Sequence, residues 1–242
     1  MIKKTIFVGI LFLLNIFFVD IRAAIQIHGT RFIYNEADAS AIVRITNEGN
    51  YASLVQTWID AGDLLMQPGE DLLPISILPP MAKIEAKQGQ LFKLIYTGIP
   101  LPKDRESIFW INVLDIPRKV LDEKSSNLVK VAVRSRMKIF YRPTGLMYTH
   151  QEAINKLRFN IDRKKNMLRI INDGAYHLTI ESAKLDGSVL DIKSMISPFS
   201  QKEYNISGIA YPLNGAEHKV VLNIIGDYGQ IISSSFSFKT VK

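Results

Sequence analysis

The chain holds few of the side-chain groupings that carry out chemistry in enzymes. Its four histidines, His28, His150, His177 and His218, are scattered, and none forms the i, i+4 pair that holds a metal on a helix. Their expected places are surface or turn positions. Asp60-Ala-Gly-Asp63 has two carboxylates but lacks the ligand spacing and terminal glutamate of a calcium loop. With no Gly-x-Ser-x-Gly elbow and no glycine-rich phosphate loop, these patterns predict no catalytic site, no metal site and no cofactor.

The absence of cysteine excludes further kinds of catalytic and metal site. No Cys occurs among the 242 residues, which excludes thiol catalysis, disulfides and thiolate metal sites. Each domain must therefore be stabilised by an ordinary hydrophobic core, for which the 47% hydrophobic composition suffices.

The first 23 residues have the pattern of a secretory signal peptide. Lys3 and Lys4 form a positive n-region, residues 6–19 are almost entirely apolar, and the expected cut follows Ala23. The apolar run is shorter than the roughly 20 residues that span a bilayer, which disfavours a membrane anchor. The chain after residue 23 keeps 27 basic and 22 acidic residues, a net charge of +5. These charges are spread along the chain, so they predict neither nucleic-acid binding nor stable membrane insertion.

The longest regular pattern is an alternation that runs from Asn127 to Pro143. Val129, Val131 and Val133 are spaced by two, which is the pattern of a β-strand with one apolar face. The run is longer than the usual strand of about 5–6 residues. A long apolar strand tends to aggregate unless it is covered. It must therefore be a covered central strand or a strand that pairs with another chain.

Shorter bursts of alternation on both sides of this run predict an all-β protein. The strands are expected at 24–34, 40–46, 51–60, 90–97, 107–116, 157–161, 167–172, 176–185, 201–206, 219–225 and 231–238. Tyr141-Arg-Pro-Thr-Gly145 is the best boundary, because proline and glycine interrupt both kinds of regular structure. Residues 149–155 after it are expected to form one short helical turn. The length after residue 23 fits two sandwiches of about 100 residues each.

Several short motifs resemble the family of periplasmic pilus-assembly chaperones, in the order expected for that family. Lys138-Ile-Phe-Tyr-Arg-Pro143 resembles the end of the last strand in the family's first domain. The other matches are Thr30-Arg31, Gln56-Thr-Trp-Ile59, Asp104-Arg-Glu-Ser107, Phe109-Trp-Ile-Asn112, Ile116-Pro117 and Gly226-Asp-Tyr-Gly229. The resemblance covers essentially the whole chain after residue 23. It implies two immunoglobulin-like β-sandwich domains, residues 24–144 and 145–242, in an L-shaped or boomerang arrangement.

The resemblance implies a periplasmic chaperone rather than an enzyme. Such a chaperone binds pilus subunits, completes their fold by lending a strand, and delivers them to an outer-membrane usher without a cofactor; chaperone–pilin pairing is itself a standard example of strand addition. A self-capping dimer is implied for the free protein. The segment of residues 117–127 is short, and the chain contains no cysteine. The chain therefore looks like the family branch with a short loop before the donor strand.

Two cations are assigned to subunit binding by the resemblance. Arg31 and Lys138 would lie in the cleft between the domains and hold the C-terminal carboxylate of a pilus subunit. A carboxylate has two acceptor oxygens, which a guanidinium and an ammonium satisfy with charge-assisted hydrogen bonds. Outside the family context, both would be solvated surface cations. Strict alternation places Lys138 on the strand face opposite to Val133, unless a bulge or a strong twist intervenes.

The resemblance also implies donor-strand residues and a charge network between the domains. The donor residues would fill an apolar groove in the subunit; outside the family context they would be inward residues of a central strand. The network would be buried at the domain junction; its alternative is three unrelated surface charges. The donor residues are Val129, Val131 and Val133, and the network residues are Glu106, Arg142 and Asp227.

Two other classes of protein remain possible. A pilus subunit would carry an N-terminal donor extension and usually a tyrosine next to the last residue, whereas Val241 occupies that place here. A secreted β-sandwich hydrolase or sugar-binding protein would need a carboxylate pair or an exposed aromatic platform. The two tryptophans, Trp58 and Trp110, stand in apolar strand context and are expected in the core.

Overall fold

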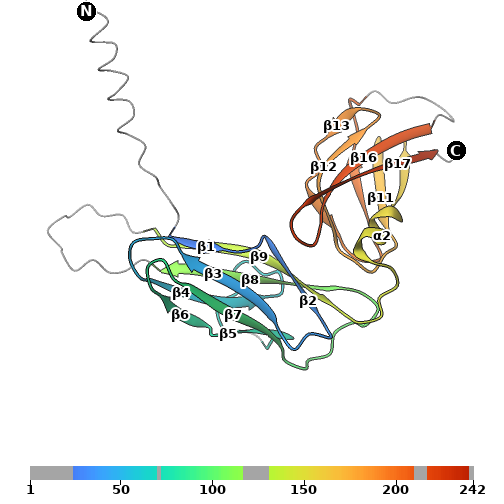
Figure 1. Cartoon of the computed structure of the whole chain (residues 1–242). Helices are drawn as coiled ribbons and strands as arrows, with labels where there is room; N and C mark the ends of the chain where they lie inside the picture. The colour runs from blue at the N-terminus through green and yellow to red at the C-terminus, as the bar shows by residue number, and fades with distance from the viewer. Residues whose placement is uncertain (1–23, 70–71, 117–130, 210–216, 240–242) are drawn as a thin grey trace, which may run out of the picture.

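The computed structural model describes residues 24–69, 72–116, 131–209 and 217–239. Two β-sandwiches follow each other along the chain and meet at an angle, which gives the molecule an L shape (Figure 1). The prediction of an all-β chain with two sandwich domains is confirmed. The expected signal peptide, residues 1–23, lies outside the described residues.

The N-terminal sandwich consists of a sheet with strand order β1-β3-β7-β5 and a sheet with order β2-β9-β8-β4-β6. The strands are β1 (Ile25–Ile27), β2 (Arg31–Asn35), β3 (Ala41–Asn47), β4 (Ser53–Asp60), β5 (Ile75–Leu78), β6 (Met81–Ile84), β7 (Gly89–Tyr96), β8 (Ser107–Ile116) and β9 (Val133–Arg142). Their inner faces form a core that includes Val43, Phe92, Ile111 and Ile139, each fully buried. The pairing of β2 with β9 is parallel, whereas β8 and β9 are antiparallel.

The strand predicted at 24–34 is wrong as a single element, because it forms two strands in different sheets. β1 pairs with β3, and β2 pairs with β9. Between them Gly29 has a φ of 132°, a conformation that glycine adopts without the clash of a Cβ atom. This change of sheet places β2 beside the C-terminal half of β9, so that Arg31 pairs with Lys138.

The long strand predicted from residue 127 begins in the described chain only at Val133, and Val129 lies outside the described residues. β9 pairs with β8 in an unbroken register, so no bulge re-aims its side chains. Met137, Ile139 and Tyr141 pack against the core. The alternate residues therefore face outward, and Lys138 is one of them, as strict alternation predicts.

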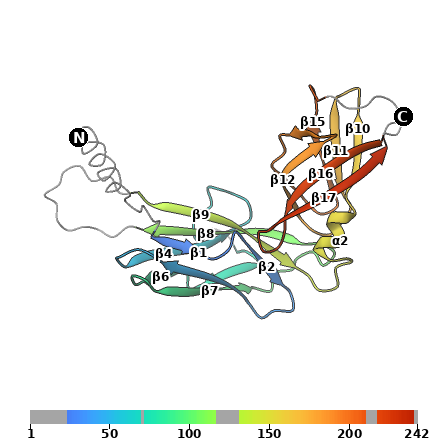
Figure 2. The same cartoon turned by 45° about the horizontal axis from the view of Figure 1, so that its top comes forward.

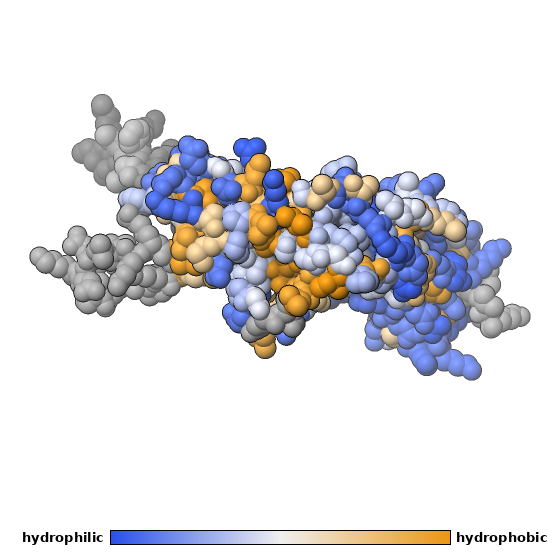
Figure 3. Space-filling view, turned by 90° about the horizontal axis from the view of Figure 1, so that it is seen from below, coloured by the Kyte–Doolittle hydropathy of each residue, from blue (hydrophilic) through white to orange (hydrophobic). Residues whose placement is uncertain are grey.

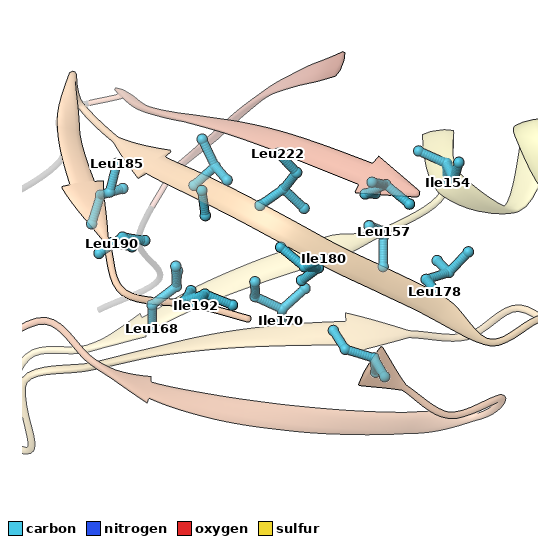
Figure 4. Close-up of a cluster of buried hydrophobic side chains, with 14 of the residues drawn as sticks. Ile154, Leu157, Leu168, Ile170, Leu178, Ile180, Leu185, Leu190, Ile192 and Leu222 are labelled. Carbon is cyan, nitrogen blue, oxygen red and sulfur yellow. The ribbon is translucent and has the colours of Figure 1, made fainter. Parts of the chain in front are cut away.

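The C-terminal sandwich has sheets of order β10-β11-β15 and β13-β12-β16-β17, with β14 pairing to β12. Leu168, Ile170, Leu178 and Leu222 lie between the two sheets and are fully buried (Figure 4). Each such side chain contributes roughly 1.5–3 kcal/mol. The strands are β10 (Arg158–Asp162), β11 (Met167–Asn172), β12 (Leu178–Leu185), β13 (Ser188–Leu190), β14 (Ser194–Ile196), β15 (Ser200–Asn205), β16 (Glu217–Ile225) and β17 (Ile231–Lys239).

One short helix, α2 (His150–Asn155), follows the boundary between the sandwiches, in agreement with the predicted helical turn. Thr149 caps it, and Glu152 completes a capping box by accepting the Thr149 backbone N–H at 2.7 Å. Both ribbon views place α2 at the bend of the molecule (Figures 1 and 2). In the described chain, no helix has the length and apolar character required to cross a bilayer.

Candidate functional site

The junction between the two domains brings together two cations that are far apart in the sequence. Arg31 opens β2 and Lys138 lies in β9, and the parallel register makes them direct partners. Neighbouring strands are roughly 4.8 Å apart. Phe32 packs into the core, so Arg31 faces outward, on the same side of the sheet as Lys138. Arg31 Nη1 donates a hydrogen bond of 3.0 Å to the carbonyl oxygen of Ile225 in β16.

Both cations are half-buried, and neither forms an ion pair with a carboxylate of the described residues. Burial lowers the pKa of Arg31, although the charges of Asp227 and Glu106 act to raise it. Burial also lowers the pKa of Lys138, and the positive charges of Arg31 and Arg136 add to this effect. Arg31 Nε is buried and has no hydrogen-bond partner there. Two adjacent cations without a counter-ion form a site for an anion with two acceptor oxygens.

Glu106, Arg142 and Asp227 form one hydrogen-bonded network across the same junction. Arg142 Nε donates to Glu106 Oε1 at 2.9 Å, and Arg142 Nη1 and Nη2 donate to the two oxygens of Asp227 at 2.8 and 2.9 Å. The second oxygen of Glu106 accepts the backbone N–H of His177 at 2.8 Å. The structure thus brings together the three residues that the resemblance assigned to a network, and it ties β8 and β9 to the C-terminal domain.

Pairing keeps Arg142 and Asp227 charged despite their burial. Burial alone would raise the pKa of Asp227, but the hydrogen bonds and charge of Arg142 outweigh burial, so the Asp227 pKa lies below its usual value. Burial alone would lower the pKa of Arg142, yet its hydrogen bonds and its two carboxylate neighbours raise it. Removing one partner of such a buried pair typically costs about 3–5 kcal/mol, because the other charge stays buried and unpaired. The network therefore holds the two domains in one relative orientation.

The predicted surface or turn positions of His150 and His177 are wrong, since the two residues are only 8% and 6% exposed. The Nδ1 atom of His177 lies 3.4 Å from Glu106 Oε2, and the Nδ1 atom of His150 lies 3.9 Å from Asp227 Oδ1. The His177 ring also covers Phe140, which faces outward from β9 yet is 2% exposed. These residues are buried by contact between the domains, which no local sequence pattern reports. His218, in β16, is buried as well.

His150 predicts a loss of stability on acidification. Burial lowers its pKa below 6.5, although the charges of Asp227 and Glu106 act to raise it. The unfolded chain therefore takes up a proton at His150 more readily than the folded chain does. The contribution of His150 to the free energy of unfolding is fully present above pH 6.5 and is lost as the pH drops towards the pKa of His150 in the folded chain. Asp227 adds a further loss only below pH 3.8. We expect a lower melting temperature at about pH 5 than at about pH 7.5.

Substitution of a single histidine tests this assignment. His150→Gln should reduce the difference between the two melting temperatures, whereas His28→Gln, at an exposed position, should leave it unchanged. An equal pH dependence in the wild type and in His150→Gln would show that other groups cause the effect.

The two described donor-strand candidates are exposed. Val131 is 68% exposed and Val133 is 55% exposed, and Val133 pairs with Asp115 at the far end of β8 from the junction. Neither residue belongs to the core of this domain. Single exposed apolar residues are common, but two exposed valines at and just before the start of β9 offer a surface that a partner could cover.

The prediction that both tryptophans are buried in the core is correct for Trp58 and wrong for Trp110, which is only partly buried. Phe109 and Ile111 face the core, so Trp110 between them faces outward, where the Arg136 guanidinium lies 4.5 Å from its ring centre. Trp58 is 7% exposed, but it also lies on the outer face, beneath Arg134 at 4.8 Å. In the part of the chain that the structure describes, no group of three or more His, Cys, Asp or Glu residues could hold a metal ion.

Known protein families match both halves of the chain. Residues 24–147 match the model described as "Pili and flagellar-assembly chaperone, PapD N-terminal domain", and residues 152–236 match "Pili assembly chaperone PapD, C-terminal domain". The chain is 40% identical over 222 residues to "Probable fimbrial chaperone YadV" of Escherichia coli strain K12, covering 88% of this chain and 89% of that protein.

Solved structures of chaperones are also similar to this chain. The crystal structure of the YadV chaperone has a TM-score of 0.73 and 36% identity, with 89% of this chain and 100% of that chain covered. The SafB chaperone of Salmonella enterica, solved in complex with the SafA pilin, matches with a TM-score of 0.73 over 90% of this chain and 97% of that chain. At 23% identity, this second match concerns the fold alone.

Proposed function

The chain belongs to the PapD family of pilus-assembly chaperones, and we propose that it acts on pilus subunits by anchoring their C-terminal carboxylate and lending them a β-strand. The observation that carries this proposal is the pairing of Arg31 with Lys138, two half-buried cations at the domain junction with no counter-ion among the described residues. The role is one of binding and folding rather than catalysis. The protein is thus a chaperone for pilus subunits.

The strand-lending step is supported by the geometry of β9. Lys138 anchors one end of the interaction, while Val133 lies at the N-terminal end of β9 on the opposite face of the strand, and the exposed Val131 precedes it. A subunit whose C-terminus is held at the anchor would extend along β9. Its apolar groove would then lie over these valines. Backbone hydrogen bonds would satisfy the subunit's open edge, and each buried valine would contribute roughly 1.5–3 kcal/mol before ordering costs.

The N-terminal domain offers further apolar surface. The space-filling view from below shows hydrophobic residues gathered over that domain, while the right-hand end of the molecule is mostly hydrophilic (Figure 3). The exposed large hydrophobic residues of the domain include Leu54, Leu78 and Met81. Exposed apolar surface of this kind is typical of proteins that bind other proteins. We propose that pilus subunits and an outer-membrane usher are the partners of this domain.

Several finer assignments belong to the same proposal. Export to the periplasm would follow removal of residues 1–23, and the domains would comprise residues 24–144 and 145–242. Val129 would be the third donor residue, and residues 117–127 would form the short loop of the corresponding family branch; both lie outside the described residues. In the absence of subunits, two copies would cap each other's donor strands.

A refolding assay tests the proposed function. The bound subunit is first identified by co-purification from the periplasm and then denatured and diluted into buffer with or without the purified chaperone. We expect a soluble one-to-one complex only when the chaperone is present, and aggregation of the subunit alone. Equal aggregation in both samples, or recovery of the chaperone without any bound subunit, would contradict the proposal.

A further inference from the structure

Next to the proposed anion site, a second group of charges lies on the outer face of the same sheet. The carboxylate of Asp60, at the end of β4, is fully buried. Arg136 holds it with two hydrogen bonds, of which Nε to Oδ2 measures 2.9 Å, and Asn112 Nδ2 donates to Oδ2 at 2.7 Å. Burial alone would raise the Asp60 pKa, but the hydrogen bonds from Arg136 and Asn112 lower it. Asp60 is therefore a buried, charged carboxylate.

The register of the sheet places this carboxylate on the same cross-strand row as Lys138. Asp60 pairs with Trp110, and Trp110 pairs with Lys138. All three face outward, and two strand spacings separate the backbones of Asp60 and Lys138 by roughly 10 Å. A lysine leaning over the indole face of Trp110 would approach Asp60, and an indole face attracts an ammonium group. Asp60 is thus a natural internal counter-ion for Lys138.

Arg136 occupies the place that Lys138 would otherwise take. Its guanidinium lies over Trp110, 4.5 Å from the ring centre, and binds both oxygens of Asp60. Its side chain is 20% exposed, whereas that of Asp60 is fully buried. A bidentate guanidinium–carboxylate pair is stronger and more specific in geometry than an ammonium contact.

We propose that Arg136 is a positioning residue for the anion site: by neutralising Asp60, it leaves Lys138 without an internal counter-ion and free to bind the C-terminal carboxylate of a pilus subunit. This inference rests on the proposed function, since it concerns how readily Lys138 accepts an external anion. Arg136 itself contacts Asp60 and Trp110.

The test measures the affinity for a synthetic peptide that copies the C-terminal segment of the co-purified subunit. Arg136→Met should weaken binding at least about tenfold, the scale of one charge-assisted hydrogen bond. The double variant Arg136→Met with Asp60→Asn should recover most of the affinity, because no free carboxylate then competes for Lys138. Arg169→Met, which removes the arginine of the Arg169–Glu203 pair on β11 and β15, is the matched control and should bind like the wild type.

A purely structural role for Arg136 makes different predictions. The Lys138 pKa, followed by NMR of labelled lysine, should rise in Arg136→Met and fall again in the double variant. If Arg136→Met does not fold, Arg136→Lys keeps a cation without the bidentate grip and should show a smaller loss, also restored by Asp60→Asn. Loss of affinity without restoration, or an unchanged Lys138 pKa, would overturn the inference. Failure of the wild type to prefer the free-acid peptide over its C-terminal amide would instead refute the proposed function.

Discussion

Arg31→Ala is expected to lower the affinity for a pilus subunit about a hundredfold or more. Losing one partner of a sheltered, charged hydrogen bond costs roughly 2–5 kcal/mol, and 1.4 kcal/mol corresponds to a factor of ten. Arg31 is the stronger anchor of the pair, because a guanidinium can hold two oxygens while Lys138 offers a point charge. The measurement is titration of the chaperone with the subunit's C-terminal peptide, and Lys138→Ala should show a smaller loss.

Two controls separate the loss of the anchor from damage to the fold. Arg31 also donates to the Ile225 carbonyl, so the melting temperature of Arg31→Ala must be measured beside its affinity. Arg44→Ala removes an exposed arginine from β3 in the other sheet and should bind like the wild type. The wild type should bind the C-terminal amide of the peptide about as weakly as Arg31→Ala binds the free acid. Undiminished binding by a folded Arg31→Ala variant would refute the assignment.

Val131→Asp is expected to abolish subunit binding while leaving the free protein folded. Val131 is 68% exposed, so a carboxylate there stays in water, and exposed substitutions usually change stability by less than about 0.5 kcal/mol. Beneath a bound subunit the same carboxylate would be buried without a partner, which is costly. Complex formation in the refolding assay and thermal melting of the purified variant are the two measurements.

Val113→Asp is the matched control for a valine in the core of the same domain. Val113 is 2% exposed in β8, so the carboxylate would be buried in the free protein and should prevent accumulation of folded chain. If Val131→Asp instead melts far below the wild type, Val131 is an ordinary structural residue and the donor strand lies elsewhere. If it melts normally and still forms the complex, Val131 does not contact the subunit.

Most of the strands could be predicted from the local alternation of apolar and polar residues. Successive side chains of a strand point to opposite faces, and only one face is buried. The expected strands at 107–116 and 167–172 coincide with β8 and β11. β5 and β6, and likewise β13 and β14, are absent from the sequence prediction, since strands of three or four residues contain too few repeats to show a period. Alternation also placed Lys138 on its correct face, as the unbroken register of β9 shows.

The resemblance supplied the candidate residues, but only the tertiary structure decided how their charges are paired. Arg136, Lys138 and Arg142 are similar cations at alternate positions of one strand, and nothing local distinguishes them. In the folded chain Arg136 meets Asp60, and Arg142 meets Glu106 and Asp227. Lys138 is left beside Arg31, because the parallel pairing of β2 with β9 joins segments more than a hundred residues apart. Charge pairing depends on distances across sheets and between domains. The alternation of residues along a single strand carries no information about these distances.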